Sequence, residues 1–270
     1  MGPQIFRTLA TRIGDTLHRS QMCVMVILLS TILWAVPALA EDSVSIQLRI
    51  EGPDKAFLNT NISVPETCSV IDTTTTTPHN FSGYKAICAL QIAQEQGLLT
   101  YQVTDWGWGF SLDKINETAN ATDWSQTWII RINNAAAQVG IGDIVLNSED
   151  NLLITYGPWP MEPLQLISST STLEVNTQLI LQTMVWDDTA NGFVDFANKS
   201  IFWIGDDSHE SSSGTLSWTA DTGGSKQIRV EADGKTRSES QTINVIQTQI
   251  PEPTINTYHV NVNYLNEEIF

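Results

Sequence analysis

The chain has 270 residues, of which 41% are hydrophobic and 16% charged, and nine are tryptophan. This composition is too apolar for a disordered chain and is enough for one large or two small hydrophobic cores. Thirteen lysines and arginines against thirty aspartates and glutamates give a formal net charge of −17. Nucleic-acid binding needs a basic surface that releases counterions, so this charge argues strongly against that class of partner and disfavours anionic membranes.

Residues 1–40 have the pattern of a secretory signal peptide. Arginines precede an apolar run at 22–36, and Ala38-Leu39-Ala40 follows just before two acidic residues. A basic segment, an apolar run and an A-x-A site are the parts of such a leader, and the run is short for a bilayer span of roughly 20 residues. We expect cleavage after Ala40, with Ala38 and Ala40 as the recognised small residues, and a secreted or cell-surface protein. The alternative is an uncleaved signal anchor.

Two cysteines follow this leader, Cys68 and Cys88. An even pair in an exported protein usually forms a disulfide. We expect a Cys68–Cys88 bond, which would stabilise the fold by roughly 3 kcal/mol in the chain-entropy model. The alternative is a pair of buried free thiols.

Residues 43–160 show the pattern of an α+β module. Alternation of apolar and polar residues predicts half-buried strands at 44–50, 58–64, 101–104, 127–132 and 151–156, and a further short strand at 143–146. Apolar positions at helical spacing predict a helix over 84–96 that ends at Gly97. Five threonines at 73–77, followed by a proline, predict a polar loop. The order β-β-α-β-β-β indicates one helix packed on a mixed sheet.

Residues 164–247 lack a helical period, and short alternating runs recur about every ten residues. These runs predict strands at 164–167, 178–186, 201–204, 214–218, 226–231 and 238–245. Such spacing favours an Ig-like antiparallel β-sandwich, so the fold class is mainly β. We expect the tryptophans of this module, Trp186, Trp203 and Trp218, to pack in its core or at a sheet edge. Residues 248–270 are expected to form a proline-containing spacer and a tail.

Several stretches of the first module resemble the DUF4430 family, a transcobalamin-like C-terminal domain. They are 81–90 (FSGYKAICAL), 105–110 (DWGWGF), 123–128 (DWSQTW) and 152–160 (LLITYGPWP). The resemblance covers residues 43–160 and implies a small β-grasp-like fold on exported bacterial and archaeal surface proteins. The family is similar to the domain that caps the corrinoid in vertebrate cobalamin carriers, so cobalamin is an implied candidate ligand. The second module resembles bacterial Ig-like surface modules.

The aromatic and glycine-rich stretch at 106–110 (WGWGF) is the most unusual feature of the sequence. A glycine beside a tryptophan lets a flat ligand or a sugar ring approach the backbone closely. We expect the ligand-binding residues to come from the aromatic residues near this stretch, namely Trp106, Trp108, Phe110, Trp124, Trp128, Tyr156 and Trp159. The alternative is that these aromatic side chains fill a small core.

Acidic loops raise the question of a calcium site. The candidate ligands are Asp187, Asp188, Asn191 and Asp195 in one loop and Asp206, Asp207 and Glu210 in another. The spacing of an EF-hand is absent, and we favour solvated turn carboxylates without a metal.

Catalytic motifs are also absent: the sequence contains no H-E-x-x-H, no G-x-S-x-G and no Walker loop. Asp105, Glu117 and Asp123 could supply a carboxylate pair for glycoside hydrolysis, but sequence spacing does not define the separation that this chemistry needs. We therefore expect a protein that is not an enzyme.

These observations predict an exported prokaryotic cell-surface protein for binding or adhesion, without a required cofactor. Its partner would be a small molecule, a glycan or a surface protein. Membrane contact is expected only through the leader or through an anchor outside this sequence. One alternative is a carrier or cap domain for a corrinoid (cobalamin) or another flat cofactor. A further alternative is a structural stalk segment of a larger surface protein.

Overall fold

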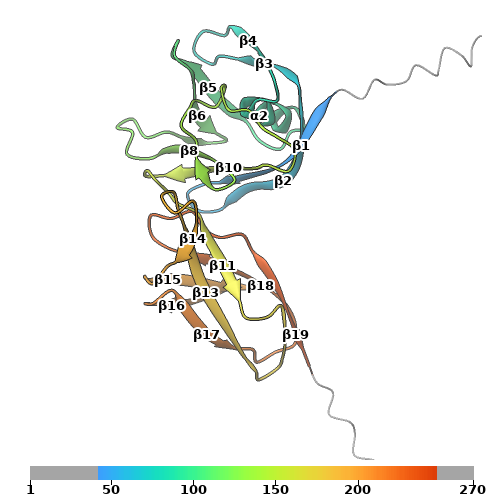
Figure 1. Cartoon of the computed structure of the whole chain (residues 1–270), viewed down its shortest axis with the longest axis vertical. Coiled ribbons are helices and arrows are strands. Elements are labelled where there is room, and N and C mark those ends of the chain that lie inside the picture. The colour runs from blue at the N-terminus through green and yellow to red at the C-terminus, as the bar shows by residue number, and fades with distance from the viewer. Residues whose placement is uncertain (1–41, 248–270) are drawn as a thin grey trace, which may run out of the picture. The chain divides into compact units, whose positions relative to one another are not determined.

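The computed structural model describes residues 42–247 (Figure 1). Residues from Ser43 onward belong to one compact unit, which contains two hydrophobic cores. The fold is mainly β, as the sequence predicts, and has one helix among the described residues. The expected leader at 1–40, with Ala38 and Ala40, and the expected spacer and tail at 248–270 lie outside the described residues.

The N-terminal module, residues 43–160, consists of three sheets and a helix. A mixed sheet has the strand order β2-β1-β10-β8-β9, with β1 and β10 parallel, and two smaller sheets have the orders β5-β6-β7 and β3-β4. The elements are β1 (Ser43–Glu51), β2 (Ala56–Pro65), β3 (Thr67–Ile71), β4 (Pro78–Ser82), α2 (Ala86–Glu95), β5 (Tyr101–Asp105), β6 (Phe110–Ile115), β7 (Thr118–Ala119), β8 (Thr127–Ile132), β9 (Ala135–Ala136) and β10 (Asn151–Gly157).

Helix α2 covers one face of this module. It contacts β2 and β3, and its side chains Ile87, Leu90 and Ala93 are buried. Strand β1 directs Ile46 and Leu48 into the same core. The apolar period of the helix and the alternation of the strand therefore meet in one core, and one helix on a mixed sheet gives the expected β-grasp-like arrangement.

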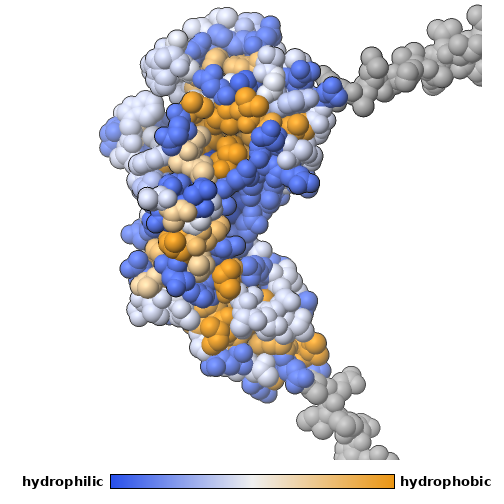
Figure 2. All heavy atoms as spheres, viewed as in Figure 1, coloured by the Kyte–Doolittle hydropathy of each residue, from blue (hydrophilic) through white to orange (hydrophobic). Residues whose placement is uncertain are grey.

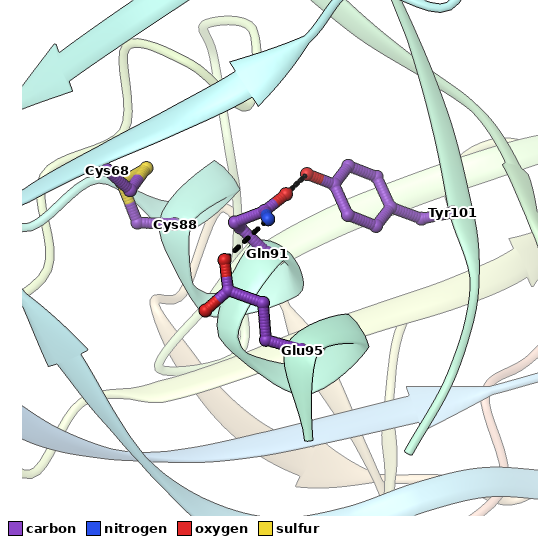
Figure 3. Close-up of a disulfide and its surroundings, with 5 residues drawn as sticks. All are labelled: Cys68, Cys88, Gln91, Glu95 and Tyr101. Atoms are coloured by element: carbon purple, nitrogen blue, oxygen red, sulfur yellow. Dashed lines mark hydrogen bonds between the residues drawn. A yellow bond between two sulfur atoms is a disulfide. The ribbon is translucent and has the colours of Figure 1, made fainter. Parts of the chain in front are cut away.

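A disulfide joins the helix to the neighbouring strand (Figure 3). Cys68 of β3 and Cys88 of α2 are bonded with an S–S distance of 2.00 Å, so the alternative of free thiols is wrong. On the helix, Gln91 accepts a hydrogen bond of 2.7 Å from the Tyr101 hydroxyl. Burial raises the pKa of Tyr101, and the negative charge of Glu95 raises it further.

The C-terminal module, residues 164–247, is a two-sheet sandwich. One sheet has the order β11-β13-β14, with β17 also paired to β13, and the other has the order β12-β19-β18-β15-β16. All pairs are antiparallel except β12 with β19. The strands are β11 (Leu164–Ser168), β12 (Thr172–Glu174), β13 (Gln178–Asp187), β14 (Gly192–Asp195), β15 (Ser200–Ile204), β16 (Asp207–Ser211), β17 (Thr215–Thr219), β18 (Gly224–Glu231) and β19 (Gln241–Ile246).

The three tryptophans of the sandwich are half-buried, in line with the expected packing role. Trp218 packs against the core, Trp186 makes an edge-to-face contact with Phe193, and the guanidinium of Arg229 lies 5.0 Å from the ring of Trp203.

One predicted strand is absent. Residues 143–146 form no strand, and only Val145 makes a single β-bridge, with Lys85. The segment follows a tight turn in which the Asp143 amide donates to Gly140. Its alternating apolar residues Ile144 and Leu146 are buried, so the alternation reflects core packing by a loop.

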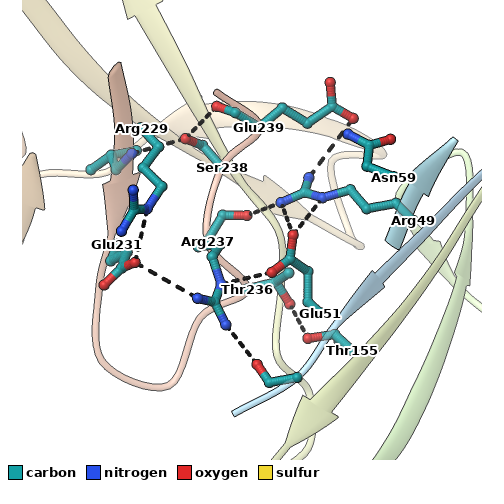
Figure 4. A network of polar contacts seen from close by, with 12 residues as sticks. Arg49, Glu51, Asn59, Thr155, Arg229, Glu231, Thr236, Arg237, Ser238 and Glu239 are labelled. Atoms are coloured by element: carbon teal, nitrogen blue, oxygen red, sulfur yellow. Dashed lines mark hydrogen bonds and ion pairs between the residues drawn. The ribbon is translucent and has the colours of Figure 1, made fainter. Parts of the chain in front are cut away.

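The face of the mixed sheet opposite α2 is buried by polar contacts (Figure 4). Arg49 and Glu51 of β1 are buried, and the Arg49 Nε donates to Glu51 Oε1 at 2.8 Å. The Arg49 guanidinium also donates to the main-chain oxygen of Arg237 at 2.7 Å, and Arg237 Nε lies 2.7 Å from Glu51 Oε2. Close by, the Thr236 hydroxyl donates to that of Thr155. The connection between β18 and β19 is therefore bonded to β1 and β10.

A second buried arginine reinforces this contact. Arg131 of β8 is fully buried and donates to the main-chain oxygens of Asn134 and Pro160 at 2.7 and 2.8 Å. It also lies 3.1 Å from the carboxylate of Asp188, which is 39% exposed. Partial burial raises the pKa of Asp188, but hydrogen bonding and the charge of Arg131 outweigh this, so that pKa lies below its ordinary value.

Replacing both cysteines, Cys68→Ala with Cys88→Ala, should lower the free energy of unfolding by about 3 kcal/mol, because the unfolded chain regains loop entropy. Denaturant titration of the full chain measures the change. A thiol reductant should shift the midpoint of the parent protein and leave that of the variant unchanged. Equal midpoints for parent and variant would contradict the expected stabilisation.

Asp188→Asn should lower the free energy of unfolding by about 1–2 kcal/mol near neutral pH, a value reduced for the partial exposure of the carboxylate. Because the folded-state pKa is depressed, the stabilisation is present above the unfolded pKa of about 4 and is lost as the pH falls through the folded value. Urea midpoints at about pH 6 and pH 3 test this. The exposed turn residue Asp206 provides the control, Asp206→Asn. A deficit in Asp188→Asn that is the same at both pH values would refute the ion pair.

Candidate functional site

The β5–β6 turn presents two tryptophans on the surface. Gly107 and Gly109 adopt φ values of 78° and 149°, a region that favours glycine. The Gly107 amide donates to Asp105 Oδ1 at 2.7 Å, and the Trp106 amide donates to the Gly109 oxygen at 3.2 Å. The turn is closed by its own backbone, so the indoles of Trp106 and Trp108 stay outside, 52% and 78% exposed.

The indole of Trp106 is held in one orientation. Its Nε1 donates to Ser111 Oγ at 2.9 Å, and that hydroxyl donates to Asp113 Oδ1 at 2.6 Å. The Thr104 hydroxyl donates to the other carboxylate oxygen of Asp113 at 2.5 Å. A half-exposed aromatic ring is thus fixed by a chain of hydrogen bonds, which lowers the entropy cost of a contact with a ligand.

Trp124 lies in the connection between β7 and β8 and is 59% exposed. Its φ is 61°, a left-handed conformation that costs a residue other than glycine roughly 1–2 kcal/mol. The Trp124 amide donates to Ala121, and the Asp123 carboxylate accepts hydrogen bonds from the hydroxyl and amide of Ser125, which lower the pKa of Asp123. Backbone strain at an exposed bulky residue is a feature of binding sites.

Trp106 and Trp124 line the same shallow depression, which has a volume of about 290 Å³. One wall is rigid, because the Asn120 carboxamide donates to the Leu112 oxygen and accepts from the Trp128 amide. The remaining lining is mostly polar and comprises Gln102, Asp113, Lys114, Ala119, Ala121 and Thr122. We call this depression the Trp106–Trp124 site.

Two other predicted tryptophans are exposed elsewhere. Trp108 lies at a separate depression with Val139 and Asp143. Trp159 is exposed in the segment that precedes the sandwich, next to a cis bond to Pro160. Neither lines the Trp106–Trp124 site.

The other three predicted aromatic residues pack inside the module. Phe110 and Trp128 are buried in the core, and the Trp128 Nε1 donates to the Thr118 oxygen. Tyr156 is half-buried, with its ring centroid 5.2 Å from that of Trp128. The alternative of core packing therefore describes these three residues.

Three polar residues of the site escaped the sequence prediction: Gln102, Asp113 and Lys114. Gln102 and Lys114 are paired in β5 and β6. The signal for β6 is weak, because Asp113 and Lys114 interrupt the alternation of its apolar residues.

The proposed calcium ligands have other partners. Asp187 accepts hydrogen bonds from the amides of Thr189 and Ala190, which lower its pKa, and Asp188 pairs with Arg131. Asp195 accepts from Gln182 at 2.8 Å. Asn191 occupies a left-handed turn position, and Glu210 pairs with Lys199 while Asp206 and Asp207 are exposed. Within residues 42–247, no three His, Cys, Asp or Glu residues gather to hold a metal ion.

Apolar residues interrupt a largely hydrophilic surface in both modules on the face seen in Figure 2. The large apolar side chains that are exposed, apart from the tryptophans, belong to different elements: Ile71, Leu98, Val139, Val145, Ile167, Ile180 and Ile246. Single exposed apolar residues are normal. No helix in the described part of the chain is long and apolar enough for a bilayer span.

Comparison of the chain with models of protein families and with curated proteins finds no match.

Trp124→Gly should leave the free energy of unfolding unchanged or raise it by up to about 1 kcal/mol, because glycine adopts the left-handed turn without strain while the ring buries little surface. Denaturant titration measures this, with Trp124→Ala as the control that retains the strain. Loss of more than about 1 kcal/mol in the glycine variant would show that the ring stabilises the fold and is not held for a ligand.

Proposed function

We propose that this chain is an exported, non-enzymatic cell-surface protein for binding or adhesion, and that the Trp106–Trp124 site holds a ring-bearing ligand by stacking. The observation that carries the proposal is the pair of half-exposed indoles at one depression. One indole is oriented by hydrogen bonds and the other by a strained turn. Aromatic faces that are already in place bind at a smaller entropy cost.

The size of the depression favours a shallow platform. Pockets that enclose a small molecule usually measure about 300–1,000 Å³, and this one lies at the lower limit. A single ring or one unit of a chain fits such a site, while the rest of the ligand stays in solvent. An adhesion protein, which contacts a polymer or a surface at one unit, needs this kind of site.

Three observations support export. The leader pattern at 1–40 has the parts of a signal peptide. The disulfide between Cys68 and Cys88 is typical of an oxidising compartment. The resemblance to the DUF4430 family and to Ig-like surface modules supports the same location, with the sandwich as spacer or second contact.

A carrier or cap domain for a corrinoid is the second candidate. It is supported by the resemblance of residues 43–160 to the transcobalamin-like domain and by the exposed ring of Trp106. A role as a stalk segment in a larger surface protein is the third candidate, and the buried contacts of Arg49, Arg131 and Arg237 support it by holding the sandwich against the first module.

Trp106→Ala and Trp108→Ala form a matched pair, because both residues lie in one turn but only Trp106 lines the site. We expect Trp106→Ala, and likewise Trp124→Ala, to weaken ligand binding at least about tenfold, since stacking on a large aromatic face is lost. Trp108→Ala should change binding less than about twofold. Calorimetric titration of the full chain with neutral oligosaccharides, cyanocobalamin and hemin measures this.

Equal losses in the Trp106 and Trp108 variants would place the ligand elsewhere. If none of these three ligand classes binds the parent chain, the proposed stacking function fails. Binding of cyanocobalamin alone would favour the carrier over the adhesion protein.

A further inference from the structure

We infer that the ligand of the Trp106–Trp124 site is a neutral saccharide, and that Asp113 selects it by accepting a hydrogen bond from a sugar hydroxyl. This inference rests on the proposed function, which requires only that a ring stacks on the tryptophans. It adds the chemical class of the ligand and a residue that determines specificity. The carrying observation is the position of Asp113 in a β-bulge.

Asp113 is an extra residue in β6. In the pairing of β5 with β6, Val103 lies opposite Leu112 and Gln102 lies opposite Lys114, which leaves Asp113 without an opposite residue. This is the arrangement of a β-bulge, a device that redirects a side chain and often occurs next to binding sites.

The bulge changes which side chains face the depression. Leu112 and Ile115 are both buried in the core, and the two residues between them, Asp113 and Lys114, are both half-exposed and line the site. A regular strand would turn one of two consecutive residues toward the core. The bulge therefore brings a carboxylate and an ammonium group to the same depression as the indoles.

Asp113 retains the capacity to accept further hydrogen bonds. A carboxylate has about four acceptor positions, and the hydroxyls of Thr104 and Ser111 occupy one on each oxygen. Lys114 keeps donors as well, because its ion pair is a 3.4 Å contact with Glu117, which is almost fully exposed. Exposed pairs of this kind contribute little to stability.

An acceptor beside a donor matches the chemistry of neighbouring sugar hydroxyls. Each hydroxyl both donates and accepts, so one can donate to Asp113 while the next accepts from Lys114. The apolar C–H face of the same ring would lie on an indole. Flat cofactors lack a hydroxyl pair at the ring edge and would leave both charged groups without a partner.

Charge points to a neutral ligand. Asp113 and Lys114 are the only charged residues that line the depression, and their charges cancel. The chain as a whole carries −17, so its field repels ligands that bear carboxylates or phosphates. A neutral saccharide meets no such repulsion.

The test measures binding of cellohexaose, maltohexaose and N-acetylchitohexaose to the full chain, together with O-methylated forms of the same sugars. The methylated sugars keep a ring to stack but cannot donate a hydrogen bond. We expect at least one native sugar to bind at least about tenfold more tightly than its methylated form, as a hydrogen bond to a charged group allows. In Asp113→Ala this preference should fall to about twofold or less.

Two further variants separate recognition from structure. If Asp113 only orients Trp106 through Ser111, then Asp113→Ala weakens native and methylated sugars equally and the preference persists, which overturns the inference. Lys114→Met removes the donor without touching that hydrogen-bond chain and should weaken the native sugar. Glu117→Gln, which alters the exposed partner of Lys114, is the control and should change binding less than about twofold.

The remaining outcomes distinguish the two proposals. Binding of cyanocobalamin or hemin that depends on Trp106, without binding of any neutral sugar, overturns the saccharide inference and leaves the stacking function intact. Binding of polygalacturonate as tightly as neutral sugars also overturns it. Absence of binding by every probe overturns both proposals.

Discussion

The central constraint on this structure is that the mixed sheet is buried on both faces. One face of β1, β10 and β8 is apolar and lies in the core that α2 covers. The other carries Arg49, Glu51 and Arg131, which are also buried. A buried guanidinium without a partner is strongly destabilising. Arg49 and Arg131 find part of their partners in the C-terminal module, at Arg237 and Asp188. The first module therefore depends on the second to satisfy its charges.

The candidate site lies where this regular framework stops. Strands β5, β6 and β7 form a separate small sheet. Three local irregularities occur within it or beside it: the glycine turn at Gly107, the bulge at Asp113 and the left-handed Trp124. Each makes the local fold less regular, and departures of this kind from the rules of local structure are expected at functional sites. The rigid sheet and the disulfide supply the stability against which such irregularities persist.

Sequence patterns predicted the elements with an unbroken period. Strand 127–132 was placed correctly, and β1, β2 and α2 within two residues at each end, because their apolar residues repeat at the spacing of the element. The disulfide followed from the cysteine count. Strands β3 and β4 were missed because they are short and polar, and β6 because its bulge breaks the alternation.

Other features depend on contacts that no local pattern contains. Arg49 and Arg131 occupy polar positions of alternating strands, which predicts solvent exposure, yet partners far along the chain bury them. Trp128 and Trp124 are four residues apart and chemically identical, but strand β8 turns Trp128 into the core while a turn holds Trp124 outside. Composition could name the aromatic residues of the site, and only the register could divide them.

The two parallel strand pairs have a mechanical consequence. In the first module β1 pairs in parallel with β10, and in the second β12 pairs in parallel with β19. In each module one of these strands lies near the point where the chain enters and the other near the point where it leaves. Tension along the backbone would pull the partners past each other and load all the hydrogen bonds of a pair together, instead of opening them one by one as in a hairpin. Both modules are thus connected in the shear geometry that slows forced unfolding.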